Sequence, residues 1–462
     1  MLFSSFSFLF WFLPTVLALY FLPALLPGRR SLAWQNGVLL VASLLFYAWG
    51  EPLYVFLMIG LIAADTLTGV LLARTHSRAL LALAVAGHVG LLILFKYLSF
   101  FAGLVGLSLT APRLPIGISF YTFQALSYLV DVYRRDVLPE RNPATFGVYL
   151  ALFPQLIAGP IVRYTDVDRA LHERTHTVAG AADGARRFSA GLAKKVLLAN
   201  PMGALFTHFT ALPELSLVGA LGALLGFSFQ IYFDFSGYSD MAIGLGRIFG
   251  FDFPENFRYP YIAKSITDFW RRWHITLSSF FREYVYIPLG GNRRGRARTV
   301  LNLFVVWTLT GLWHGAAWSF VLWGVYYFVL LALEKFVLAR FLPRLPLFLR
   351  HALTLLAISL GWMLFAFDGS TAALCFAALG RFLGALVGQN GLVIGADLYD
   401  LLRHLPLLAL CALDATPLPR KLYARCAARA AWLTAVLPIC ALLLAVIELS
   451  DAGFNPFLYF RF

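Results

Sequence analysis

The sequence contains little charge and little cysteine. Asp, Glu, Lys and Arg make up 13% of its 462 residues, roughly half of the ~25% found in typical soluble domains. The four cysteines lie in the last quarter of the chain with no CxxC spacing, which argues against a disulfide framework and against a Cys/His metal site. They are Cys375, Cys411, Cys426 and Cys440.

Motifs of several large enzyme classes are also missing. The chain contains no Walker A or GxGxxG phosphate loop, no HExxH motif and no GxSxG nucleophile turn. These absences argue against ATP-driven chemistry, zinc proteolysis and serine hydrolysis.

Apolar residues dominate what is present. Hydrophobic residues account for 60% of the chain and aromatic residues for 16%, which leaves too little polar surface for a water-soluble globule of this size. No alternating strand pattern appears, and a membrane span needs ~20 apolar residues in a helix. We therefore predict an all-α integral membrane protein, a polytopic bundle of about 11–13 membrane helices. With no internal repeat or linker, residues 1–462 are predicted to form a single transmembrane domain. The apolar stretches cover about 6–26, 32–50, 52–73, 79–107, 114–133, 144–162, 188–211, 215–250, 299–334, 351–367, 372–388 and 432–449.

The net charge of +14 comes from basic residues placed between these stretches. That distribution favours membrane topology and contact with anionic lipid headgroups over nucleic-acid binding. The positive-inside rule places the first basic loop, around Arg29 and Arg30, in the cytoplasm, together with a basic platform from 251 to 298.

One polar segment within the platform permits two interpretations. At helical spacing, the aromatic residues of 265–280 share a face and the arginines lie elsewhere, as in an amphipathic helix at headgroup depth. Alternatively, Arg271, Arg272 and Lys264 receive the phosphates of a cytoplasmic cofactor. The pattern alone favours the interfacial helix.

His314 lies about fifteen residues into an apolar run, at a depth where an ionisable group is costly. It is either a catalytic base facing a polar cavity or a neutral histidine bonded to a neighbouring helix. Gly311 and Gly315 either form a close packing face or clear space for a substrate. Because no Cys or Ser nucleophile motif accompanies it, the chemistry that suits this imidazole is general-base activation of a hydroxyl that attacks an acyl group.

Several other charged residues occur within apolar stretches. Asp234 and Asp240 either hold a histidine in its useful tautomer or bridge helices to Arg or Lys, and the bridge is favoured. Asp65, His88 and Lys96 are expected to have satisfied polar contacts.

The motifs FWRRWH (269–274) with TLS (276–278), followed by GLWHG (311–315), resemble those of the membrane-bound O-acyltransferases, and most of all the alginate O-acetyltransferase branch. The likeness runs through most of the chain and is looser over the last ~100 residues. It includes residues 41–50, 115–124, 131–133, 234–242 and 454–457.

This resemblance implies a ring of helices around a central tunnel. It makes His314 the acyl-transfer base or the residue that polarises the acceptor, and gives His274 a supporting role on the cytoplasmic side. It also implies acetyl-CoA as a cytoplasmic donor, no tightly bound cofactor or metal, and a location in the bacterial inner membrane. A periplasmic acetyltransferase and a polysaccharide biosynthesis complex are the expected partners, with alginate the expected polymer. Two rivals remain: a transporter or flippase of an acyl carrier, and a non-catalytic scaffold that recruits a periplasmic acetyltransferase.

Overall fold

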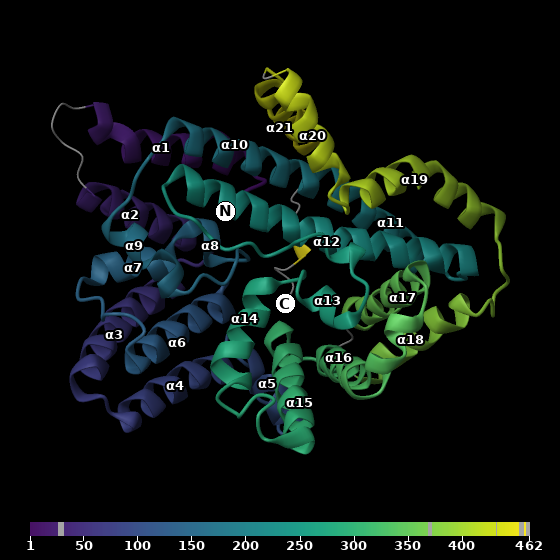
Figure 1. The fold of residues 1–462 in the computed structure, drawn as a ribbon, viewed down its shortest axis with the longest axis horizontal. Coiled ribbons are helices and arrows are strands. Elements are labelled where there is room, and N and C mark those ends of the chain that lie inside the picture. The colour runs from purple at the N-terminus through teal and green to yellow at the C-terminus, as the bar shows by residue number, and fades with distance from the viewer. Residues whose placement is uncertain (26–31, 368–371, 431, 452–456, 459–462) are drawn as a thin grey trace. The chain divides into compact units, whose positions relative to one another are not determined.

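The computed structural model describes residues 1–25, 32–367, 372–430, 432–451 and 457–458. Throughout these ranges the regular secondary structure is helical, which confirms the predicted all-α fold (Figure 1). The first basic loop, at Arg29 and Arg30, and residues 454–456 of the closing motif lie outside the described residues.

Seven of the described helices are long and apolar enough to cross a membrane, so the chain is a multi-pass membrane protein. They are Leu32–Gly50, Tyr54–Thr75, Arg78–Leu104, Leu217–Ile248, Trp318–Phe336, Leu347–Ala366 and Leu433–Ser450. A bent pair, Gly395–Asp414 and Leu418–Arg429, would be an eighth.

This number is smaller than the 11–13 estimated from the apolar stretches because several stretches form short or broken helices. The stretch 144–162, for example, contains only α7 (Pro143–Ala151) and the one-turn α8 (Phe153–Leu156). The predicted single domain, ring and tunnel stay predictions.

The chain divides into two compact units. Unit 1 comprises residues 1–192, 238–255 and 449–460; unit 2 comprises 193–237, 256–448 and 461–462. The long helix α12 (Leu217–Ile248) contributes its first part to unit 2 and its last part to unit 1.

Unit 1 is built on the pairing of α2 with α7 and of α3 with α6. Asn142 accepts a hydrogen bond from the backbone N–H of Ala144 and Pro143 follows it, a favourable start for α7. The helices of this unit, besides α7 and α8, are α1 (Leu13–Phe21), α2 (Leu32–Gly50), α3 (Tyr54–Thr75), α4 (Arg78–Leu92), α5 (Leu98–Leu104), α6 (Ile118–Arg134), α9 (Tyr164–His172) and α10 (Val178–Ala193).

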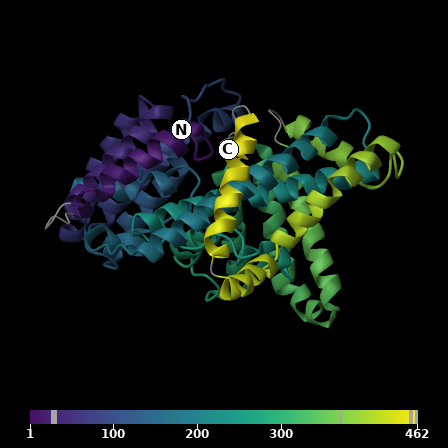
Figure 2. The same cartoon turned by 90° about the horizontal axis from the view of Figure 1, so that it is seen from above.

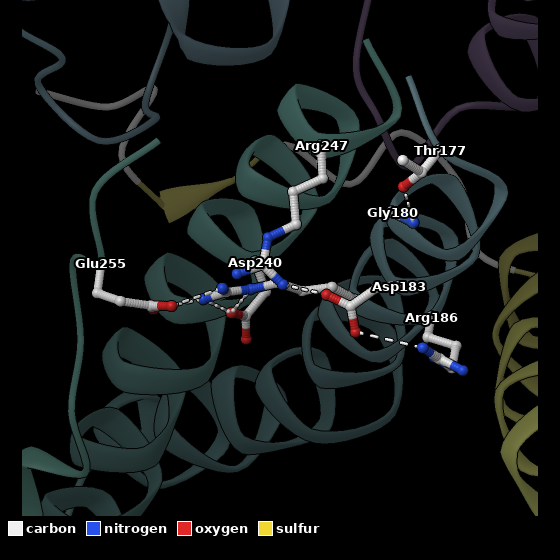
Figure 3. Close-up of polar contacts among 8 residues, drawn as sticks. Thr177, Gly180, Asp183, Arg186, Asp240, Arg247 and Glu255 are labelled. Carbon is white, nitrogen blue, oxygen red and sulfur yellow. Dashed lines mark hydrogen bonds and ion pairs between the residues drawn. The ribbon is translucent and has the colours of Figure 1, made fainter. Parts of the chain in front are cut away.

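Charged residues buried in the helices are paired, as expected. Asp65 and His88 join α3 to α4 at 3.0 Å, and both are about 95% buried. Asp240 shares the guanidinium of Arg187 with Glu255, at 2.9 Å and 2.6 Å (Figure 3). The predicted bridging role of Asp240 is therefore confirmed.

Unit 2 holds a tight hairpin of α15 and α16, which lie side by side in both views (Figures 1 and 2). The Asp234 carboxylate of α12 lies 2.5 Å from the Lys195 ammonium, and both side chains are buried, which confirms the second predicted bridge. The remaining helices are α11 (Asn200–Ala211), α13 (Ile266–Trp270), α14 (Ile275–Phe281), α15 (Gly295–His314), α16 (Trp318–Phe336), α17 (Leu347–Ala366), α18 (Ala372–Leu386), α19 (Gly395–Asp414), α20 (Leu418–Arg429) and α21 (Leu433–Asp451).

Candidate functional site

His274 lies in a turn, fully buried, between the short helices α13 and α14 of unit 2. The expectation of one continuous amphipathic helix over this segment is wrong, because the backbone of His274 is left-handed (φ 43°, ψ 53°) and breaks it. The break is held from outside the segment: the N–H of Ile275 donates to the carbonyl of Asn256, and the N–H of Arg258 donates to the carbonyl of Arg272. A tertiary partner has thus overridden the helical periodicity.

The side chain of Asn256 also holds the His274 ring. Its Oδ1 lies 3.1 Å from Nδ1 of His274 and accepts hydrogen bonds from the hydroxyl (3.0 Å) and the backbone N–H (3.4 Å) of Thr276. Asn256 is fully buried as well. Sequence reasoning missed this residue, since an asparagine eighteen positions before the histidine belongs to no recognisable spacing.

The helix before His274 is anchored by an acidic residue of α16. The carboxylate of Glu334 accepts hydrogen bonds from the backbone N–H groups of Ile266 (2.6 Å) and Thr267 (3.1 Å) at the start of α13. Ser265 caps the same end through the N–H of Asp268. A negative charge on unpaired N–H groups is favourable at this position, so α16 fixes where α13 begins.

His314 is the last residue of α15, buried at the tip of the α15–α16 hairpin. The apolar run 299–334 therefore folds back on itself, and His314 is close to a helix end rather than midway along one span. The helices approach closely where a Cβ on Gly311 would lie 2.3 Å from the carbonyl oxygen of Phe320, and one on Gly324 would lie 2.4 Å from that of Trp307. The packing role considered for Gly311 is confirmed.

The fold brings the two predicted histidines to one aromatic side chain. The ring centroid of Trp313 lies 5.8 Å from that of His274 and 5.1 Å from that of His314. His314 also contacts Trp323 (5.0 Å) and His274 contacts Phe235 (4.7 Å). The site is thus two buried imidazoles within an aromatic wall, all in unit 2.

A family model for membrane-bound O-acyltransferases matches residues 118–371, a range that contains both histidines. The chain is 42% identical to the "Probable alginate O-acetylase AlgI" of Pseudomonas syringae pv. tomato, over 84% of this chain and 75% of that protein. It is 37% identical to the protein of the same name from Pseudomonas putida, over the whole of both chains. It is 34% identical to the peptidoglycan O-acetyltransferase of Helicobacter pylori, over 85% of this chain and 80% of the relative.

The chain belongs to the membrane-bound O-acyltransferase family. It is an O-acyltransferase, and the resemblance found in its motifs is confirmed.

The predicted donor-binding residues of the acyltransferase differ in their availability. Arg272 donates from Nε to the Asp268 carboxylate at 2.8 Å, so part of its hydrogen-bonding capacity is already used. Arg271 and Lys264 are exposed. Three further exposed arginines, Arg293, Arg294 and Arg296, lie before and at the start of α15 and were not singled out from the sequence.

Burial lowers the pKa of His274 from 6.5 to about 3, so its ring is neutral at physiological pH. A neutral imidazole can accept or donate a hydrogen bond and can take up a proton during a reaction. Within the described residues, no group of three or more His, Cys, Asp or Glu side chains is arranged to hold a metal ion. The two imidazoles of this candidate site are able to take part in proton transfer and hydrogen bonding.

Proposed function

We propose that this acyltransferase passes acetyl groups from cytoplasmic acetyl-CoA across the bacterial inner membrane for O-acetylation of an extracytoplasmic polysaccharide, with alginate as the polymer. The names of the relatives support the acetyl group and the polymer class. The observation that carries the proposal is the meeting of His274 and His314 at Trp313 within the matched family region.

The proposed reaction needs only a base. His314 takes the proton of an acceptor hydroxyl as its oxygen attacks the thioester carbonyl. A C–O bond forms, the C–S bond breaks, and the proton passes to the departing thiolate. Helix-end dipoles or backbone N–H groups stabilise the oxyanion, and His274 supports the site from the cytoplasmic side.

The donor is expected to bind through its phosphates at Arg271, Arg272 and Lys264, since guanidinium and ammonium groups suit phosphate oxygens. The exposure of Arg271 and Lys264 supports this assignment. Membrane lipid headgroups offer the same chemistry at this basic platform.

A periplasmic acetyltransferase, working with the polysaccharide biosynthesis complex, completes the transfer in this proposal. The product leaving the membrane protein is then an acetylated acceptor group, and the sugar hydroxyls receive the acetyl group outside the cytoplasmic membrane.

The first experiment measures the acetyl content of secreted polysaccharide from cells that carry the wild-type chain or His314→Ala at equal membrane levels. His208→Ala is the matched control, because this half-exposed histidine pairs with Asp400 and has no role in the proposed reaction. Loss of acetyl groups with unchanged polymer yield is expected for His314→Ala alone.

Two further results would overturn the proposal. A transporter or flippase would keep its activity when His314 is replaced by Gln, and a scaffold would keep it when both histidines are replaced.

Supplying labelled acetyl-CoA to inside-out membrane vesicles tests the donor and the direction, with label expected on the acceptor at the lumenal side. If no label from acetyl-CoA reaches the acceptor in the vesicles, acetyl-CoA is refuted as the donor.

A further inference from the structure

We propose that Asn256 is a positioning residue that holds the His274 ring as its Nδ1–H tautomer and leaves Nε2 as an open hydrogen-bond acceptor for the substrate. This inference rests on the acyl transfer proposed above, because it holds that the Nε2 lone pair of His274 accepts a hydrogen bond from the substrate of that reaction. The substrate groups it fits are O–H and N–H donors of the acyl donor or acceptor, other than the hydroxyl whose proton His314 takes.

The orientation of the Asn256 amide follows from its other partners. Amide oxygen and nitrogen are interchangeable by a flip of the side chain, and only the hydrogen-bond network decides between them. Here the atom that faces His274 also faces the backbone N–H of Thr276, which can only donate. A flipped amide would bring two N–H donors together, so this atom is the oxygen.

The tautomer of His274 follows from the orientation of the amide. A carbonyl oxygen accepts hydrogen bonds only, so the ring nitrogen 3.1 Å away must carry the proton. In a neutral imidazole the other nitrogen then holds a lone pair. Among the described residues, Nε2 of His274 is buried and has no hydrogen-bond partner.

An unpartnered nitrogen of this kind is costly in a folded chain, because a buried polar atom loses its contact with water. The backbone adds to the cost: a non-glycine residue in the left-handed region is uncommon. Three hydrogen bonds to Asn256, from the His274 ring, the Ile275 N–H and the Thr276 hydroxyl, hold the arrangement in place. Costs of this type, held by surrounding structure, are typical of sites that await a ligand.

The amide is also suited to the task because it is neutral. A carboxylate at this position would favour the imidazolium form, so Nε2 would become protonated and stop accepting at a higher pH. An amide fixes the same tautomer without a charge, and burial keeps the pKa of His274 at about 3. Asn256 thus orients the ring and leaves its acceptor open at physiological pH.

The direct test is the ¹⁵N spectrum of the histidine side chains in full-length protein in lipid, with the His274→Gln variant used to assign the resonances of His274. In the wild-type protein we expect a protonated Nδ1 and an unprotonated Nε2. A protonated Nε2 in the wild-type spectrum would overturn the inference without any variant of Asn256.

Two substitutions test the role of Asn256. Asn256→Leu removes the acceptor and is expected to convert His274 wholly or partly to the Nε2–H tautomer, with acyl transfer lowered about 10–100-fold, as for other residues that orient an imidazole. Asn256→Asp keeps the acceptor and is expected to keep the Nδ1 proton. The matched control is Asn302→Leu: Asn302 is an equally buried asparagine of unit 2 whose amide donates to the carbonyl of Gly291. It should leave the His274 resonances unchanged.

Unchanged His274 resonances in Asn256→Leu would refute the positioning role. If Asn256→Leu fails to fold, the wild-type and Asn256→Asp spectra still decide the tautomer. The spectra also separate this inference from the proposed function: an inactive wild-type protein with an open Nε2 would refute acetyl transfer alone, whereas an active one with a protonated Nε2 would refute only the role of Asn256.

Discussion

Each unit contains a buried histidine with one side-chain hydrogen-bond partner, and the two partners differ in charge. In unit 1, His88 pairs with the Asp65 carboxylate at 3.0 Å. In unit 2, His274 pairs with the Asn256 amide at 3.1 Å. In both, the second ring nitrogen has no hydrogen-bond partner among the described residues. One pair joins an acid to a basic ring, and the other is neutral.

The two histidines also differ in the structure that surrounds them. His88 and Asp65 lie within long helices, α4 and α3, and their pairing joins two helices of a bundle. His274 lies in a left-handed turn among aromatic rings, near a second histidine. The acid–base pairs, His88 with Asp65 and Lys195 with Asp234, each join two segments of the chain, whereas the neutral pair lies beside the second histidine of the proposed site.

The difference between His274 and His88 is tested most directly by replacing each histidine in turn with alanine. His274→Ala is expected to lower acetyl transfer about 10–100-fold, because the substrate loses the hydrogen bond that Nε2 would accept. His88→Ala is expected to leave the rate per folded molecule unchanged. The measurement is acetyl transfer normalised to folded protein in the membrane, and equal losses in the two variants would contradict the distinction.

The free energy of unfolding should fall more when His88 is replaced than when His274 is replaced. His88→Leu leaves the Asp65 carboxylate buried without its partner, which costs about 3–5 kcal/mol, whereas His274→Leu removes a neutral hydrogen bond and costs about 1–3 kcal/mol. Replacing Asp65 and His88 together by Leu should recover most of the loss. Thermal unfolding in detergent measures all three, and a double variant no more stable than His88→Leu would count against a packing role.

The pH dependence sharpens the contrast between amide and carboxylate. With its pKa lowered to about 3, His274 stays neutral near neutral pH, and the unfolded chain alone binds this proton between about pH 6.5 and 3, so its contribution to stability falls as pH falls through that window. In Asn256→Asp the nearby negative charge should raise the pKa of His274 by about one to three units. Acetyl transfer by that variant is then expected to decline at a higher pH than in the wild type as the medium is acidified. Identical acid limbs in the two pH–rate profiles would contradict this.

Helix α15, which carries His314, and helix α3, which carries Asp65, should differ in how far a larger side chain at a close packing position destabilises them. A Cβ on Gly311 of α15 would lie 2.3 Å from the backbone oxygen of Phe320, and one on Gly69 of α3 would lie 2.5 Å from the hydroxyl of Tyr128. Backbone cannot move aside as a side-chain tip can, so Gly311→Ala should cost about 1–3 kcal/mol and Gly69→Ala less. Unfolding midpoints compare the two, with Gly60→Ala in an open part of α3 as the control. A larger drop in unfolding midpoint for Gly69→Ala than for Gly311→Ala would show that the α15–α16 hairpin accommodates an added methyl group more easily than its geometry indicates.

The sequence predicted the residues of the site better than their setting. The motifs predicted His314 and His274, which the fold brings to one tryptophan, and their catalytic roles stay predictions. Asp234 and Asp240 were correctly expected to pair with basic residues. Fewer of the described helices are long and apolar enough to cross a membrane than the apolar stretches suggested. An apolar run does not reveal whether it continues or folds back, as 299–334 does at His314.

Composition and local motifs by themselves determined that this is a helical membrane acyltransferase, because the transfer of apolar residues out of water and the order of the motifs are properties of the chain alone. Only the tertiary structure decided that Trp313 contacts both histidines and that the Asn256 amide lies within hydrogen-bond distance of His274. Trp313 and His274 are 39 positions apart and Asn256 and His274 are 18 apart. Contacts over such separations depend on how the chain folds, which no local pattern records.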